Sequence, residues 1–107
     1  MSNYARESVS STIDPDRLAA TLEALANRNR LAIFEFLRRR GFSLTGSSDR
    51  PSVGEIAAEF DLALSTVSHH LKELHRSGLI ICRREGKNVF CEVNPQALRA
   101  LRDYFGS

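Results

Sequence analysis

The sequence predicts a mainly α-helical domain that carries one small β-hairpin, and two observations support this fold class. Apolar residues recur every three or four positions along five segments, which is the spacing of one face of an α-helix. Across residues 79–93 the period changes to two around a short polar turn, which is typical of two paired antiparallel strands. With 107 residues, of which 42% are hydrophobic, the chain has the size and composition of a single domain.

Residues 1–13 are polar and rich in serine, and we expect them to form a flexible N-terminal arm. The folded domain is expected to span residues 14–107. Its first helix opens at Asp14-Pro15, because aspartate caps free backbone amides and proline suits the first helical turn. The apolar stripe of this helix consists of Leu18, Leu22 and Leu25.

The second helix is expected after Asn27–Asn29, and its apolar residues lie on more than one face. Such a helix is central and buried. It ends at Arg38–Gly41, where three arginines suit the negative end of the helix dipole. A loop rich in Gly, Ser and Asp then covers residues 41–51. The apolar residues of the second helix are Leu31, Ile33, Phe34, Phe36 and Leu37.

The third helix begins at Ser52, and Glu55 three residues later completes a capping box. A tight turn at 61–63 leads to a fourth helix, for which we expect Ser65 as the N-cap and Gly78 as the stop. Two short helices joined by such a turn form a helix-turn-helix unit. The inward residues are Val53, Ile56, Ala57 and Phe60 in the third helix and Val67, Leu71 and Leu74 in the fourth.

A β-hairpin directly follows this unit. Its strands are expected at Leu79–Arg83 and Val89–Val93, on either side of the tip Arg84–Lys87. A last helix opens at Asn94-Pro95 and places Leu98, Leu101 and Tyr104 or Phe105 on one side. The expected architecture is therefore a winged helix-turn-helix of about five helices with a two-stranded wing.

The fourth helix has a polar face opposite its buried stripe. Small hydroxyl side chains let a helix approach DNA closely and bond base edges or phosphates, and a histidine can donate to a base acceptor. An amphipathic surface helix without a ligand shows the same pattern, so this face alone leaves both interpretations open. The residues expected to face bases and nearby phosphates are Ser65, Thr66, Ser68 and His69.

Positive charge gathers in the same part of the chain. The net charge is only +2, but residues 62–88 hold five Lys or Arg against two Asp or Glu. A charged edge hairpin is common without any ligand, but a basic tip beside a polar helix face favours binding to double-stranded DNA. The side chains expected to neutralise phosphates are Lys72, Arg83, Arg84 and Lys87.

The sequence contains the stretches ALANRNRLAI (24–33), LSTVSHHLKEL (64–74), GLI (78–80) and RREGK (83–87). Together they resemble the ArsR/SmtB-type family of repressors, and the resemblance covers about residues 14–105. It implies a homodimer built on the first and last helices, with the fourth helix in the major groove and the hairpin as wing. It also implies a repressor that a ligand releases from a palindromic operator. The expected dimer contacts are Leu18, Leu22, Leu25, Leu98, Leu101 and Phe105.

No metal or cofactor is expected. Metal-sensing members of this family place a Cys-x-Cys pair early in the third helix, and the aligned positions here are Ser52 and Gly54. A second family site uses His and acidic residues of the last helix, which offers only Asp103. The histidines at 69, 70 and 75 never have the i,i+4 spacing of helical ligand pairs. We expect a DNA contact for His69 and packing for His70.

An enzyme is not expected, because no catalytic signature surrounds the residues that would have to act, Cys82 or Cys91 with His75. Two alternatives to the DNA-binding repressor are kept. One is a thiol- or metal-responsive repressor that uses Cys82 and Cys91. The other is a helix-turn-helix used only for protein contacts, in which the basic wing and polar helix face would have no role.

The placement of the two cysteines depends on the register of the hairpin. Cys91 alternates with two valines and should point inward as a small hydrophobe. A turn at Gly86-Lys87 would set Cys82 opposite Cys91, whereas a turn at Glu85-Gly86 would leave the two thiols diagonal on one face. Redox sensors need an accessible, acidified thiolate, and burial raises a thiol's pKa, so we expect structural cysteines.

The cytoplasm is the expected compartment, and no membrane partner is expected. No apolar run approaches the roughly 20 residues that span a bilayer. Residues 1–13 lack the apolar centre of a signal peptide. Two cysteines do not form the disulfide framework of a small secreted domain.

Overall fold

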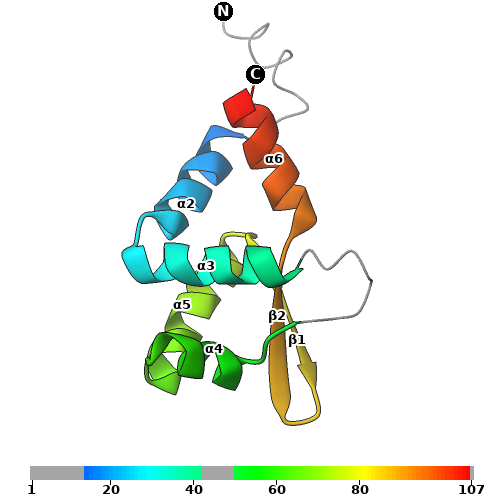
Figure 1. The fold of residues 1–107 in the computed structure, drawn as a ribbon. Coiled ribbons are helices and arrows are strands. Elements are labelled where there is room, and N and C mark those ends of the chain that lie inside the picture. The colour runs from blue at the N-terminus through cyan, green and yellow to red at the C-terminus, as the bar shows by residue number, and fades with distance from the viewer. Residues whose placement is uncertain (1–13, 42–49, 107) are drawn as a thin grey trace, which may run out of the picture.

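A computed structural model describes residues 14–41 and 50–106 (Figure 1). This part holds five helices and one two-stranded antiparallel sheet, which confirms the predicted fold class. The predicted arm at 1–13 and most of the predicted loop at 41–51 lie outside the described residues. The elements are α2 (Pro15–Leu25), α3 (Arg28–Gly41), α4 (Val53–Phe60), α5 (Leu64–Arg76), β1 (Ile80–Glu85), β2 (Asn88–Val93) and α6 (Pro95–Gly106).

Side-chain caps fix the starts of α2 and α4. The Asp14 carboxylate accepts from the backbone N–H groups of Asp16 and Arg17 at 3.2 and 3.4 Å. The predicted capping box is present at α4: Ser52 Oγ accepts from the Glu55 N–H at 3.1 Å, and Glu55 Oε1 accepts from the Ser52 N–H at 2.8 Å. These bonds satisfy amides that have no partner within the helix.

The start of α5 differs from the prediction. Asp61 takes the left-handed conformation with φ 54° and ends α4, so only two residues separate it from α5. Helical geometry therefore begins already at Leu64, and the N-cap is Ala63, which makes no side-chain cap bond. The prediction of Ser65 as N-cap is wrong, because this serine lies inside the first turn.

The hairpin adopts the first of the two predicted registers. Gly86-Lys87 forms the turn, and of these two residues Gly86 has the positive φ, 66°, which glycine adopts without steric cost. β1 extends to Glu85, two residues beyond the predicted end, because this residue still pairs with Asn88. The pairs further along the hairpin include Arg84–Val89 and Cys82–Cys91.

A short segment that the sequence did not reveal lies along the outer edge of β2. The Cys91 N–H donates to the Pro51 carbonyl at 3.1 Å, and Ser52 forms an isolated antiparallel bridge with Phe90. The chain therefore passes the wing immediately before it enters α4. This contact anchors the hairpin to the helix-turn-helix unit.

The core lies around α3, which crosses the middle of the molecule (Figure 1). The predicted burial of α3 is confirmed for Ile33, Phe34 and Leu37 but is wrong for Leu31, which is 50% exposed. Leu31 lies two residues before Ile33, about 200° around the helix, and so on the opposite face. In α4 and α5 the predicted core residues Ile56, Ala57, Val67, Leu71 and Leu74 are buried, and Val53 and Phe60 pack against them.

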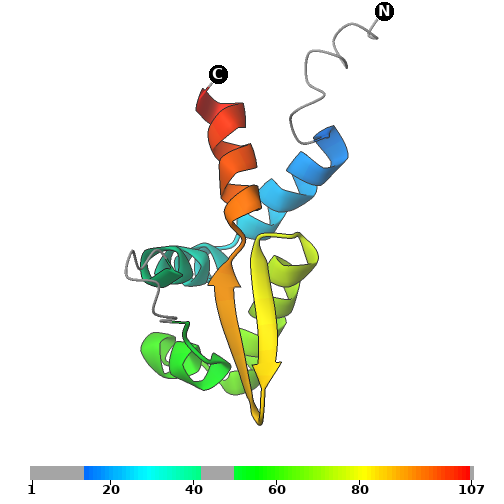
Figure 2. The ribbon, with the colours of Figure 1, turned by 90° about the vertical axis from the view of Figure 1, so that its right-hand side faces the viewer.

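The two ends of the molecule differ. α2 and α6 extend together from one end of the molecule (Figures 1 and 2), and α6 has no buried residue. The hairpin tip points to the opposite end, which α4 and α5 share (Figure 1). None of the helices in the described ranges is long and apolar enough to cross a membrane.

Candidate nucleic-acid interface

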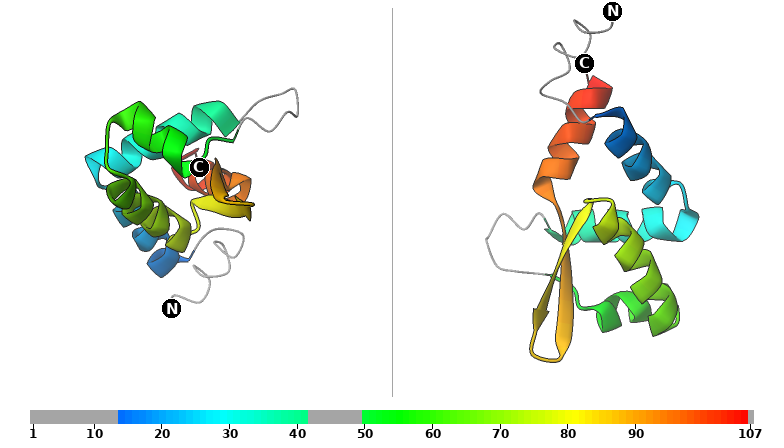
Figure 3. Two further views of the ribbon diagram at one scale, coloured as in Figure 1. Left: turned by 90° about the horizontal axis from the view of Figure 1, so that it is seen from below. Right: turned by 180° about the vertical axis from the view of Figure 1, so that it is seen from behind.

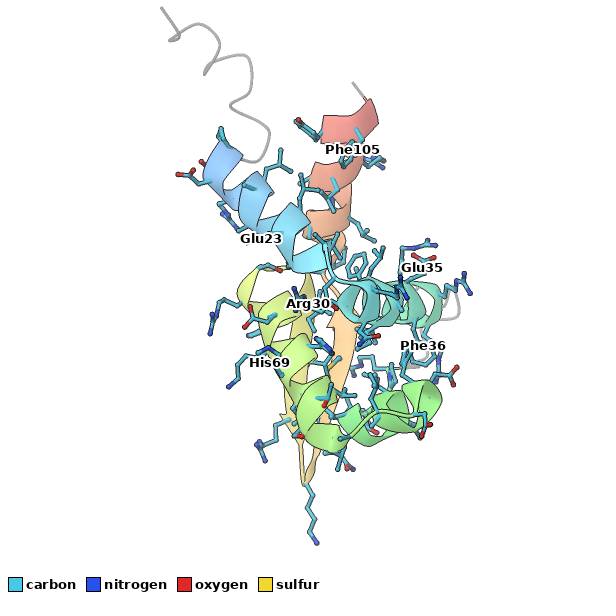
Figure 4. All side chains as sticks on the ribbon, turned by 90° about the vertical axis from the view of Figure 1, so that its left-hand side faces the viewer. Glu23, Arg30, Glu35, Phe36, His69 and Phe105 are labelled. Carbon is cyan, nitrogen blue, oxygen red and sulfur yellow. The ribbon has the colours of Figure 1, made fainter. Side chains whose placement is uncertain are left out.

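The outer face of α5 is polar and exposed. The helix buries Val67, His70, Leu71 and Leu74, and this anchors it to the core. Ser65, Ser68, His69 and Lys72 are exposed as predicted, whereas Thr66 is half-buried. Figure 4 shows His69 on the outer side of the helix. α5 is therefore held rigidly on one side while its opposite face is open to a ligand.

The tip of the wing carries exposed positive charge. Arg83, Arg84 and Lys87 are all exposed. Within residues 14–41 and 50–106 none of these three forms an ion pair. Their charges are therefore available to an anion such as a phosphate.

Arg50 is a residue of this region that the sequence analysis missed. Its guanidinium lies 3.7 Å from a Glu85 carboxylate oxygen and 3.8 Å from one of Glu92. It thus offsets the negative charges of the wing and ties the wing to the start of α4. Residues 50 and 51 belong to no periodic apolar pattern, and their one signal in the sequence is their position directly before Ser52, the first residue of the capping box.

The structure brings the two predicted groups of DNA-binding residues to one end of the molecule. The hairpin runs beside α5, and its tip and the N-terminal end of α5 point the same way (Figures 1 and 3). The N-terminal turn of α5 has no side-chain cap, so its backbone N–H groups also face this end. Leu64, which the sequence analysis did not select, is 59% exposed here. Serines, a histidine, cationic side chains and free amides thus share one surface.

His70 packs into the core, as predicted. It is 7% exposed, and its Nδ1 atom has no hydrogen-bond partner in the described part of the chain. Burial lowers the pKa of His70, and the positive charges of Arg30 and His69 lower it further. Arg30 is itself fixed, because its Nε donates to the Ala24 carbonyl at 2.6 Å and joins α3 to α2.

This lowered pKa predicts that acid destabilises the fold. The unfolded chain binds the proton more readily, so the contribution of neutral His70 to stability is present above its ordinary pKa of 6.5 and is lost as the pH falls below it. We expect the Tm of the native chain to drop more than that of His70→Gln as the pH falls from about 7.5 to about 5.5. His69→Gln removes the smallest of the three causes of this shift and should keep more of the native slope than His70→Gln. Equal slopes for all three proteins would contradict this expectation.

The described residues contain no group of three or more His, Cys, Asp or Glu side chains that could hold a metal ion. His75 Nδ1 lies 3.3 Å from the Ile80 carbonyl oxygen, so its ring bonds the backbone. Cys91 is buried, as predicted, and its sulfur lies 3.3 Å from that of Cys82. Both cysteines are free thiols.

The predicted dimer contacts lie at the other end of the molecule, on α2 and α6. Leu25, Leu98 and Leu101 are half-buried and pack against the core, and Leu18 is half-buried too. Leu22 and Phe105 are 38% and 66% exposed. Figure 4 shows Phe105 near the free end of α6. These helices thus expose apolar side chains far from the polar face of α5.

Comparison with known proteins agrees with this geometry. A family model described as a helix-turn-helix domain matches residues 25–83. The transcriptional activator HlyU of Vibrio cholerae is 32% identical over 80 residues, which are 75% of this chain and 66% of that protein. A crystal structure of an ArsR family transcriptional regulator superposes with a TM-score of 0.69 and 25% identity and covers 89% of both chains.

A further similar structure describes an assembly. It is the homodimeric winged helix-turn-helix DNA-binding domain of Mb0332 from Mycobacterium bovis. It has a TM-score of 0.66 and 29% identity to this chain and covers 85% of this chain and 79% of that one. The molecule is thus similar in fold and in sequence to regulators that bind DNA.

Proposed function

Because the chain belongs to the ArsR family of winged helix-turn-helix transcriptional regulators, we propose that it represses transcription as a homodimer on a palindromic operator. The family confirms the expectation of a DNA-binding regulator rather than an enzyme. The observation that carries the finer proposal is the surface at one end of the molecule. There the N-terminal end of α5 and the tip of the wing lie at the same end of the molecule (Figure 3), and the wing cations are exposed and form no ion pair within the described residues.

In this proposal α5 lies in the major groove. An α-helix fits that groove, and close approach requires small side chains at the contact. Ser65 and Ser68 meet this requirement, and His69 lies beside them on the same exposed face. His69 supplies a donor to an acceptor on a base edge. Leu64 offers an apolar side chain for a thymine methyl group.

Phosphates are held around this contact. Arg83, Arg84 and Lys87 extend from the wing to the DNA backbone, while Lys72 reaches a phosphate at the edge of the groove. The uncapped N-terminus of α5 suits a further phosphate, since its free N–H groups and its dipole both favour an anion. Such contacts position the protein but do not distinguish sequences.

Two copies associate through α2 and α6. The exposed apolar side chains Leu22 and Phe105 supply the contact, and the similar domain from M. bovis is homodimeric. A two-fold axis between the copies sets two α5 helices on one face of the DNA. A symmetric dimer requires a palindromic operator with half-sites about 34 Å apart, one turn of DNA.

The experiment that tests this function is selection of bound duplexes from a random DNA pool, followed by a reporter assay with the selected sequence. We expect a palindrome and lower reporter expression when the protein is present. Enrichment of no sequence would contradict specific binding. Higher reporter expression would contradict repression and would match the activator role named for the HlyU relative.

Removal of one wing charge tests the phosphate contacts. Arg84→Ala should weaken binding to operator and to unrelated duplex alike, and should reduce the slope of log K against log salt by about 0.9, since one phosphate contact is lost. Arg39→Ala removes an exposed arginine at the end of α3 and serves as the matched control. An unchanged salt slope for Arg84→Ala would remove the wing from the interface.

A further inference from the structure

Cys82 and Cys91 form a directly opposed pair in the middle of the wing. The Cys91 N–H points away from β1, because it donates to the Pro51 carbonyl on the other edge of β2. The two cysteines therefore occupy a non-hydrogen-bonded pair of the antiparallel ladder. In such pairs the Cα atoms lie about 4.5 Å apart and the side chains are closest, and this separation falls within the range that a disulfide spans.

The sulfur atoms are already in contact. Cys82 Sγ lies 3.3 Å from Cys91 Sγ, close enough for one thiol to donate to the other. A disulfide requires a separation of about 2.05 Å, so the sulfurs need to approach by little more than an ångström. The two strands need no new register for this movement, because the turn at Gly86-Lys87 already fixes the pair.

The two thiols are not equivalent. The expectation of structural cysteines rested on burial of the thiols, and only one of them is fully buried. Cys91 is fully buried, but Cys82 is only half-buried. The hydrogen bond that Cys91 donates lowers the pKa of Cys82, although partial burial opposes this. The same bond, burial and the nearby negative charge of Cys82 raise the pKa of Cys91. Cys82 is thus the accessible, acidified thiol and Cys91 the buried partner.

We propose that Cys82 and Cys91 are an oxidative modification site, which hydrogen peroxide closes to an intramolecular disulfide, and that the oxidised wing binds the operator more weakly. The second half rests on the proposed function. The first half depends only on the geometry of the hairpin.

The chemistry proceeds in two steps. The Cys82 thiolate attacks one peroxide oxygen, the O–O bond breaks, and the departing hydroxide takes up a proton to become water. The Cys91 sulfur then attacks the Cys82 sulfenic acid. The S–O bond breaks, the S–S bond forms, and the departing hydroxide leaves as water with the Cys91 proton. Two thiols lose two electrons, and one peroxide gains them to give two waters.

The pair lies between the anchored base of the wing and its basic tip. Arg83 and Arg84 directly follow Cys82 in β1, and residues 51 and 52 hold β2 at Cys91 and Phe90. Drawing the strands together at this point changes their twist, and the tip beyond the pair moves relative to α5. A wing that moves in this way no longer meets the phosphates that it binds when reduced.

The chemical half is tested on the reduced full-length protein with hydrogen peroxide. We expect loss of both thiols to Ellman's reagent, a Cys82–Cys91 cross-link in non-reducing peptide mass spectra, and recovery with dithiothreitol. Cys91→Ala should trap a dimedone-reactive sulfenic acid on Cys82, whereas Cys82→Ala should leave Cys91 unreacted. A disulfide between two chains, or thiols that survive peroxide, would overturn the site whether or not the variants fold.

The DNA half is tested on the selected operator by comparing reduced, oxidised and re-reduced protein. We expect oxidation to raise the operator Kd about fivefold or more, the lower end of the range for coupled sites. Dithiothreitol should restore the Kd, and the Cys82→Ala/Cys91→Ala variant should show no change. A disulfide that leaves the Kd unaltered would overturn this half. Reduced protein that binds no sequence selectively would overturn the proposed function, while the cross-link would still decide the chemistry.

Discussion

Replacement of Phe105 by Glu is expected to separate the homodimer into monomers and to weaken operator binding by about 10²-fold or more. Each half-site then binds a separate protomer, without the high effective concentration that dimerisation gives the second protomer. Phe105 is 66% exposed at the end of α6, so the substitution removes little from the core of one chain. It instead places a charge in the surface that we assign to the dimer contact. A charge buried there without a partner opposes association.

Gln96→Glu is the matched control for Phe105→Glu. It adds the same charge to α6 at an exposed position nine residues earlier, about 180° around the helix. Sedimentation at micromolar concentration should show dimers for the native chain and for Gln96→Glu, and monomers for Phe105→Glu. A native chain that is monomeric, or a Phe105→Glu dimer, would contradict the assignment of α2 and α6.

His69→Ala is expected to weaken operator binding by about 1–3 kcal/mol, which corresponds to roughly 5- to 150-fold in Kd. Binding to unrelated duplex should scarcely change, because His69 is assigned to a base edge rather than to a phosphate. Gel-shift titrations at fixed salt on both duplexes measure this difference.

His75→Ala provides the control on the same helix. His75 lies six residues after His69 and bonds the Ile80 carbonyl through its ring. It should therefore retain operator affinity close to native. An operator affinity for His69→Ala equal to that of the native chain would remove α5 from the groove.

The sequence alone predicts those features that local chemistry determines. Ser52 and Glu55 specify the start of α4 because the two side chains satisfy each other's backbone amides. The exposed face of α5 follows from the helical spacing of its buried residues, and seven of the eight predicted DNA-binding side chains are exposed. Each of these predictions needs only residues a few positions apart.

Features that depend on distant parts of the chain could not be predicted. The exposure of Leu31 depends on which sides of α3 its neighbours cover. Both predicted registers of the hairpin point Cys91 inward. The position of the turn, which the structure places at Gly86-Lys87, decides between them. Arg50 reaches Glu85 and Glu92 across tertiary contacts that no local pattern records.

The predicted start of α5 is wrong for a different reason. Ser65 is a good N-cap by residue type, but the left-handed Asp61 shortens the linker and lets the helix begin at Leu64. The cap preference of one serine is only about 1 kcal/mol, so packing of the preceding turn overrides it. Because α5 begins at Leu64, this exposed apolar side chain joins the proposed DNA surface.

A hydroxyl-radical footprint on the selected operator reports which backbone sugars the protein protects on each strand, and so tests directly whether two symmetric copies of α5 and the wing contact the DNA. We expect two protected segments related by two-fold symmetry, with centres about 34 Å apart on one face of the duplex. In the Arg84→Ala protein the outer protected positions of each half-site, which the wing covers, should become accessible. A single protected segment without symmetry, or uniform cleavage along the selected duplex, would contradict binding by a symmetric dimer through α5 and the wing.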